Sequence, residues 1–284
     1  MPEQRTEAGR AFWPVAEETR TFPPYGEETP VGRRTDGRVA VLTLRHRPHN
    51  LLDAAFCERI VEALHWAWAQ GARAVIVESG LRHFSAGADV DAMLAAATEG
   101  NGVLDWRLPD VLRAFDELPI PIVASVHGIC AGGGLEVALA CDLVVVGESA
   151  KLGLVEAAVG LHPLMGAVQR ITQRAGAARA KEMVMLGRRH DARTMERWGI
   201  VNRVVADERL GAATMALARE LAAGPTVAHA ATKRLVSIAV DQGVRAADEA
   251  MSEIQEPILR SADFRAGVES LNRDGPGRAR FGGW

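Results

Sequence analysis

The stretch His127–Asp142, which reads "HGICAGGGLEVALACD", decides which fold we predict for this chain. Three consecutive glycines open an apolar segment that also contains the carboxylate of Glu136. Each glycine destabilises a helix by roughly 0.5–1 kcal/mol relative to alanine, and an unpartnered buried carboxylate is also costly. One explanation is a tight strand-to-helix turn that packs against a neighbouring segment. The other is a helix start whose free N–H groups stabilise an anion or a developing oxyanion.

Composition excludes several classes of protein. The 284 residues are 48% hydrophobic with a formal net charge of -3, so a large core is expected and nucleic acid is not an expected partner. Cys57, Cys130 and Cys141 form no CxxC pair and no cluster with histidines, so we expect no metal site and a reducing, cytoplasmic location. Prolines, glycines and acidic residues interrupt the longest apolar stretch, residues 118–147, and we expect no contact with a membrane.

Strand-like and helix-like segments alternate in the first part of the chain. Asp53 is the predicted N-cap of the first helix. Strands alternating with helices predict right-handed crossovers and a mostly parallel sheet, so the fold class is α/β. Short apolar runs predict buried strands at residues 38–46, 72–79, 121–128 and 143–149.

Three parts are predicted along the chain. Residues 1–36 are rich in Pro, Glu, Arg and Gly without periodicity, which predicts an extended or partly disordered leader. Residues 37–205 form the predicted α/β core, and residues 206–284 a C-terminal helical region. Within that region, long helices are expected at residues 207–223, 225–241, 244–261 and from about 263.

Two glutamates lie in apolar surroundings. Glu136 follows the glycines, and Glu156 lies in a second apolar stretch, "LVEAAVG". Either each has an arginine partner or a partly exposed position, or the two lie together and raise each other's pKa. In the second case a pair of carboxylates that hold one water can divide the roles of acid and base.

The loop "HFSAGADVDAM", His83–Met93, offers a further backbone N–H at a small residue after a glycine. An ordinary strand-to-helix turn with Asp89 or Asp91 as the helix cap is the alternative interpretation.

The two glycine loops, their order and the second glutamate together resemble the enoyl-CoA hydratase/isomerase, or crotonase, superfamily. The resemblance covers residues from about 38 to about 272, and it is strongest in His83–Met93 and in the stretch from Ile120 to Pro163. It implies a spiral core of ββα repeats and C-terminal helices used for trimerisation. A homotrimer or a dimer of trimers is therefore expected.

The resemblance also implies roles for individual residues. The backbone N–H groups of Ala88 and Gly133 would hold the thioester oxygen of an acyl-CoA as it becomes an enolate. Glu136 and Glu156 would add water syn across the double bond of a 2-enoyl-CoA. Coenzyme A would enter as part of this substrate, with no other cofactor. Further substrate contacts are expected from Ala86, Gly87, Asp89, Gly132 and Leu164.

The segment after Pro163 departs from the family pattern, which often has glycines there. Leu164 and Met165 are bulkier and could narrow the acyl pocket. We interpret His162, beside this loop, as structural. Isomerases of the family commonly keep only one of the two glutamates, so Glu136 together with Glu156 favours a hydratase.

Other functions stay open as alternatives. An isomerase, another acyl-CoA enzyme of the superfamily or a non-catalytic acyl-CoA-binding paralogue would share the same loops. A dinucleotide-binding oxidoreductase would use Gly132 and Gly134, but Val137 replaces the third glycine of its motif. A hydrolase with Ser125 or Cys130 as nucleophile has no GxSxG motif and no evident base.

Overall fold

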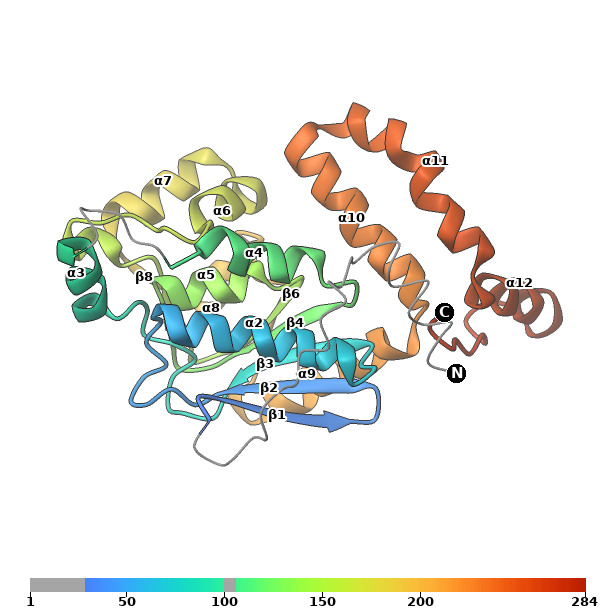
Figure 1. Ribbon diagram of the computed structural model, residues 1–284, viewed down its shortest axis with the longest axis horizontal. Helices are drawn as coiled ribbons and strands as arrows, with labels where there is room; N and C mark the ends of the chain where they lie inside the picture. The colour runs from blue at the N-terminus through green and yellow to red at the C-terminus, as the bar shows by residue number, and fades with distance from the viewer. Residues whose placement is uncertain (1–28, 100–105) are drawn as a thin grey trace.

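A six-stranded sheet forms the centre of the molecule, shown in Figure 1 as a computed structural model that describes residues 29–99 and 106–284. The strand order is β1-β2-β3-β4-β6-β9. Only the β1–β2 pair is antiparallel; the other neighbours in this sheet are parallel, which confirms the predicted α/β class. The strands are β1 Val31–Asp36, β2 Val39–Leu44, β3 Ala74–Ser79, β4 Ile122–Val126, β6 Leu143–Gly147 and β9 Arg203–Val205.

The predicted leader ends too late in the sequence. Residues 1–28 lie outside the described residues, but Val31–Asp36 forms β1 and pairs with β2 along its whole length. A two-residue turn joins the strands, and its first residue, Gly37, has a φ of +58°, as such a turn requires. The sequence "VGRRTD" looked irregular because an edge strand need bury only one face, and here only Val31 is fully buried.

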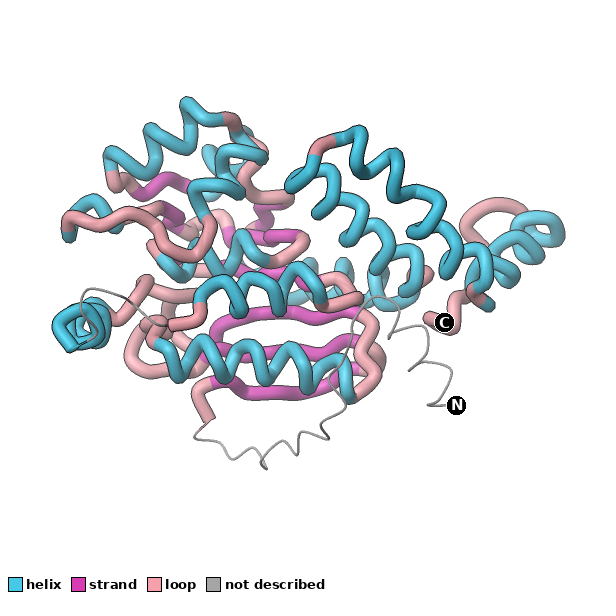
Figure 2. Tube along the Cα trace, turned by 45° about the horizontal axis from the view of Figure 1, so that its top comes forward, coloured by secondary structure: helices cyan, strands magenta, loops and turns pink. Residues whose placement is uncertain are grey.

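Helices cover both faces of the sheet (Figures 1 and 2). Helices α2, Ala54–Ala69, and α4, Leu108–Glu117, pack together on one face. The Asp53 carboxylate accepts a hydrogen bond of 2.7 Å from the Phe56 N–H, which confirms the predicted cap of α2. Helix α9, Leu210–Ala223, packs on the opposite face against β2, β3, β4 and β6. The prediction had placed α9 with the C-terminal helices, whereas its contacts belong to the central sheet.

A small second sheet positions the glycine-rich turn. Its strands are β5, Ile129–Ala131, β7, Lys151–Gly153, and β8, Arg189–Asp191. Strand β5 follows β4 directly and leads into α5, Gly133–Ala140, whose residues are all buried. Strands of three residues leave too short an alternation to be recognised in a sequence, and the prediction missed all three.

The remaining helices complete the core. Helix α3 precedes a gap in the described residues, and η1 and η2 are short 3-10 helices. Their bounds are α3 Val90–Glu99, α6 Ala167–Ala175, α7 Ala177–Leu186, α8 Ala192–Arg197, η1 Glu156–Val159 and η2 Asp207–Arg209. None of the helices in the described ranges has both the length and the apolar character that a membrane span requires.

Three C-terminal helices extend away from the sheet as an arm (Figure 1). They are α10 Thr226–Gln242, α11 Val244–Arg260 and α12 Ala262–Asp274, close to the predicted bounds. The Lys233 ammonium of α10 forms a 2.9 Å ion pair with Asp142, whose carboxylate also accepts a hydrogen bond from the Ile122 N–H. The arm is thus fixed to the residue that ends the glycine-rich stretch.

The base of the arm is held by two buried charged side chains. Arg73, only 2% exposed, donates hydrogen bonds to the Phe281 carbonyl at 2.9 Å and to the Thr226 hydroxyl at 2.8 Å. Asp263 accepts a hydrogen bond of 2.9 Å from the Gly283 N–H. Each charge is therefore hydrogen-bonded, as buried charges must be.

Candidate active site

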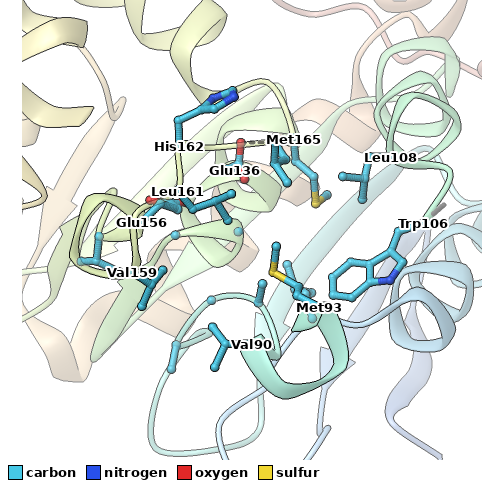
Figure 3. Close-up of a pocket in the computed structure, with 18 of the residues that line it drawn as sticks. Val90, Met93, Trp106, Leu108, Glu136, Glu156, Val159, Leu161, His162 and Met165 are labelled. Carbon is cyan, nitrogen blue, oxygen red and sulfur yellow. Dashed lines mark hydrogen bonds between the residues drawn. The ribbon is translucent and has the colours of Figure 1, made fainter. Parts of the chain in front are cut away.

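A cavity of about 220 Å³ lies beside the glycine-rich turn (Figure 3). The loop after β3, the start of α5 and η1 surround it, together with the segments that lead into α3, α4 and α6. Its lining residues are Leu52, Ala86, Gly87, Ala88, Val90, Met93, Trp106, Leu108, Gly132, Gly133, Glu136, Val155, Glu156, Ala158, Val159, Leu161, His162, Leu164 and Met165. The structure therefore brings Ala86, Gly87, Ala88, Gly132, Gly133, Glu136, Glu156 and Leu164 together, as predicted.

Two free backbone N–H groups lie close together in this cavity. Ala88 forms a parallel bridge with Leu52 in which the N–H groups of Leu52 and Asp89 are bonded, while that of Ala88 is not. Gly133 is the first residue of α5, where an N–H has no acceptor within the helix. Within residues 29–99 and 106–284 neither N–H has a hydrogen-bond acceptor. A β-carbon built on Gly133 would lie 3.7 Å from the Ala88 nitrogen, so the two turns are in contact.

The glycines are needed for this close approach. A β-carbon on Gly134 would lie 2.5 Å from the Ser85 Cβ atom, and one on Gly132 would lie 3.2 Å from Glu156 Oε1. Gly132 also has a φ of +52° and a ψ of −130°, a conformation that a side chain would strain. The structure therefore confirms that the triplet is a turn packed against neighbouring segments. The free N–H of Gly133 is also compatible with the second explanation, a site for an anion or an oxyanion.

Buried hydrogen bonds fix the loop that carries Ala88. The Asn50 side chain, which is fully buried, donates to the Ser79 hydroxyl at 2.8 Å and to the Phe84 carbonyl at 2.9 Å. The Ser85 hydroxyl donates to the Asn50 carbonyl at 2.7 Å and accepts from the Gly87 N–H at 3.2 Å. Sequence reasoning missed Asn50 and Ser85, because a single polar residue in a loop carries no pattern that marks it as buried.

Glu136 is anchored by backbone N–H groups. The residue as a whole is 3% exposed, and its Oε1 accepts hydrogen bonds from the N–H groups of Met165 at 2.7 Å and Ala167 at 3.1 Å. Burial raises the pKa of Glu136 to about 7; the nearby charge of Glu156 adds to this rise, and the backbone hydrogen bonds oppose it. Glu136 can therefore exchange a proton near neutral pH.

Glu156 is held differently, at the first position of η1. Neither of its carboxylate oxygens is exposed, and neither has a hydrogen-bond partner among the described residues. Burial raises the pKa of Glu156, and the nearby backbone N–H groups of Glu156 and Val155 and the charge of His162 oppose this rise. In the described ranges no arginine pairs with Glu136 or Glu156, which contradicts the ion-pair alternative. Both residues line the cavity.

Asp89, which was expected to contact the substrate, does not line the cavity. Its Oδ1 atom accepts a hydrogen bond of 2.9 Å from the Ala92 N–H and caps α3. A carboxylate next to the start of a helix can accept hydrogen bonds from the free N–H groups there. This agrees with the alternative interpretation of the loop, in which Asp89 caps the helix.

The apolar wall of the cavity was not predicted. Met93, Trp106 and Leu108 lie across the cavity from the two glutamates in Figure 3. Apolar residues at the ends of helices look like ordinary core residues in a sequence, so no signal marked them. The cavity thus combines two carboxylates and two free N–H groups with an apolar wall, an arrangement suited to polarising a carbonyl and moving a proton beside it.

The nucleophile alternatives lack the contacts they need. Cys130 is fully buried, and its burial raises the pKa of the thiol far above neutrality. The Ser125 hydroxyl is bonded to Thr214, while His127 Nε2 is bonded to the Leu81 carbonyl, so the two form no pair. No group of three or more potential ligands in the described part of the chain could hold a metal ion.

The raised pKa of Glu136 predicts a pH-dependent stability. Between about pH 4.5 and pH 7 the folded chain holds this proton while the unfolded chain releases it, so stability falls as the pH rises. We expect wild type to lose up to about 3 kcal/mol of unfolding free energy relative to Glu136→Gln across this range. Urea denaturation of both proteins at several pH values measures the difference, and parallel pH curves would contradict it.

Comparison with known proteins identifies the family. Residues 34–275 match the enoyl-CoA hydratase/isomerase family model. A probable enoyl-CoA hydratase of Rhizobium meliloti is 34% identical over 221 residues, covering 74% of this chain and 84% of the relative. Carnitinyl-CoA dehydratase of Salmonella typhi is 33% identical over 251 residues, covering 83% and 92%.

Solved structures agree with this result. The structure of an enoyl-CoA hydratase of Geobacillus kaustophilus superimposes with a TM-score of 0.85 at 26% identity, covering 91% of this chain and 98% of that one. An enoyl-CoA hydratase of Mycobacterium smegmatis gives a TM-score of 0.80 at 28% identity, covering 86% and 96%. The crotonase-like fold with its C-terminal helical region is thereby confirmed, and the chain belongs to the enoyl-CoA hydratase/isomerase family, the crotonase superfamily.

Proposed function

We propose that this protein is an enoyl-CoA hydratase that adds water syn across the double bond of a 2-enoyl-CoA thioester. The observation that carries the proposal is the meeting of Glu136, Glu156 and the free N–H groups of Ala88 and Gly133 in one cavity with an apolar wall. Relatives named as hydratases and as a carnitinyl-CoA dehydratase support water addition or its reversal as the class of reaction.

In the proposed mechanism the thioester oxygen accepts hydrogen bonds from Ala88 and Gly133. These donors stabilise the negative charge that develops on the oxygen as the β-carbon is attacked. A water held between the carboxylates loses a proton to one of them while its oxygen bonds to the β-carbon. The other carboxylate orients the water and delivers a proton to the α-carbon, so that the enolate returns to a thioester.

Glu136 and Glu156 are suited to this exchange for different reasons. The pKa of Glu136, raised to about 7 by burial, makes both of its protonation states accessible at neutral pH. The oxygens of Glu156 have no hydrogen-bond partner among the described residues, so a water admitted beside them would supply the partner that they lack. Coenzyme A is brought by the substrate, and the mechanism needs no other cofactor.

Two other functions within the superfamily remain as alternatives. An isomerase would move the double bond with a carboxylate alone, without adding water. A non-catalytic acyl-CoA-binding paralogue would use the N–H pair for binding alone; the observation behind this alternative is that the bulky side chains of Leu164 and Met165 line the cavity.

We predict that Glu136→Gln and Glu156→Gln each slow hydration by ~10²–10⁴-fold, because each removes a group that transfers or orients a proton. Loss of the enone absorbance of a short 2-enoyl-CoA measures the rate. Calorimetry should show that both variants still bind acyl-CoA and that wild type does not bind NAD.

The outcomes separate the alternatives. Double-bond migration without hydration would assign an isomerase, and tight acyl-CoA binding without any turnover would assign the non-catalytic paralogue. Unchanged hydration rates in both variants would refute the mechanism.

We also propose that the arm α10–α12 joins copies of this chain into a homotrimer or a dimer of trimers. Support comes from the family resemblance and from large apolar side chains exposed along the arm, which would be costly to leave in water. These side chains are Val236, Val240, Val244, Met251, Leu259, Phe264, Val268 and Leu271.

Light scattering should give a mass three or six times the 30.4 kDa of one chain. Val244→Glu combined with Leu259→Glu should weaken assembly at least tenfold, because charges would replace buried apolar contacts. Leu94→Glu, an equally exposed position on α3, is the control and should leave the mass unchanged. A monomeric wild type at micromolar concentration would contradict the assembly.

A cytoplasmic location is a further proposal. Cys57, Cys130 and Cys141 are all buried as free thiols, which fits a reducing compartment. Some relatives are named as mitochondrial proteins. Fractionation of the cells that produce this protein therefore tests its location.

A further inference from the structure

We propose that Trp106 sets the upper length of the acyl chain by separating the reaction cavity from a second, larger cavity between α2 and α4. The inference rests on the proposed acyl-CoA chemistry and adds a specificity-determining residue to it.

Trp106 borders both cavities. It lies just before α4 and is 9% exposed, so its indole is almost completely enclosed. It lines the reaction cavity together with Met93 and Leu108, and it also lines the cavity between α2 and α4. No other residue is common to the two linings among the described residues.

The indole closes the apolar side of the reaction cavity. In Figure 3 Trp106 lies on the side opposite Glu136 and Glu156, with the sulfur-bearing side chains of Met93 and Met165 between. A thioester whose β-carbon lies at the two glutamates would therefore extend its acyl chain toward Trp106. This wall offers no charged group, so it suits a hydrocarbon chain.

The second cavity offers room beyond the indole. Its volume is about 660 Å³, three times that of the reaction cavity. Apolar side chains of both helices contribute to its lining, with Val61 from α2 and Val111 and Ala114 from α4. Charged residues make up about half of its lining; they are Glu58, Glu62, Arg107, Asp110, Arg113 and Glu117. A hydrocarbon chain that entered this cavity could pack against the apolar side chains of the two helices. Its end would reach solvent at the charged rim.

The consequence is a chain-length limit imposed by a single side chain. Each additional CH₂ buried from water strengthens binding about fourfold. In wild type the affinity should stop increasing with chain length once the acyl chain reaches the indole. In Trp106→Ala a methyl group replaces the indole and should join the two cavities. The affinity should then continue to increase for longer acyl chains.

The experiment compares wild type, Trp106→Ala and Trp106→Phe on 2-enoyl-CoA thioesters of increasing, even chain length. The readout is the ratio of kcat/KM for long chains to that for the four-carbon substrate. We expect this ratio to rise at least tenfold in Trp106→Ala and less in Trp106→Phe. Trp198→Ala is the matched control, because Trp198 is partly buried against Arg179 and His190 and lines neither cavity. Its ratio should equal that of wild type.

Binding of saturated acyl-CoA thioesters, measured by calorimetry over the same chain lengths, gives a second readout that needs no turnover. If wild type hydrates nothing, the proposed function fails, and Trp106 is then judged on these affinities alone. A folded Trp106→Ala whose chain-length profile matches wild type in both readouts would overturn the inference. If Trp106→Ala does not fold, a chain-length profile of Trp106→Phe that matches wild type would likewise overturn the inference. Failure of wild type to bind any acyl-CoA would overturn both the inference and the proposed function.

Discussion

The close approach of two backbone turns, the loop that ends at Ala88 and the start of α5 at Gly133, is the constraint on which the site depends. A side chain at Gly134 would force the turns apart, because its β-carbon would overlap Ser85. One at Gly132 would crowd the Glu156 carboxylate and strain the backbone. Glycine destabilises a helix start in isolation. Here that cost is offset by contacts that bring two N–H groups to one point, where they can act together on one oxygen.

Asn50 and Ser85 turn this contact into a rigid one. Their hydrogen bonds hold the loop from a position behind the site, where no substrate would reach them. Donors that are fixed before the substrate arrives lose little freedom when charge develops, which is why such preorganisation matters for catalysis. The loop is therefore best regarded as part of the core rather than as a surface connection.

Burial of the two glutamates is the second constraint. A carboxylate enclosed by apolar groups favours its protonated form, so the same walls that would bind a hydrocarbon chain also bring the pKa of Glu136 near neutrality. Backbone N–H groups from the segment after Pro163 keep Glu136 in place. The departure of Leu164 and Met165 from the family pattern thus leaves the anchoring of Glu136 intact, since anchoring uses the backbone and not these side chains.

The sequence by itself determined the α/β class, the cap at Asp53, the C-terminal helices and eight of the residues that line the cavity. These features rest on periodicity, on local capping chemistry and on a motif resemblance, all of which act over short stretches of chain. Tertiary structure alone decided that Val31–Asp36 forms an edge strand, that α9 belongs to the sheet and that Asp89 caps a helix instead of facing the cavity. It alone also placed Asn50 behind the loop that carries Ala88 and Trp106 between two cavities, because burial and contacts between distant segments leave no local pattern in the chain.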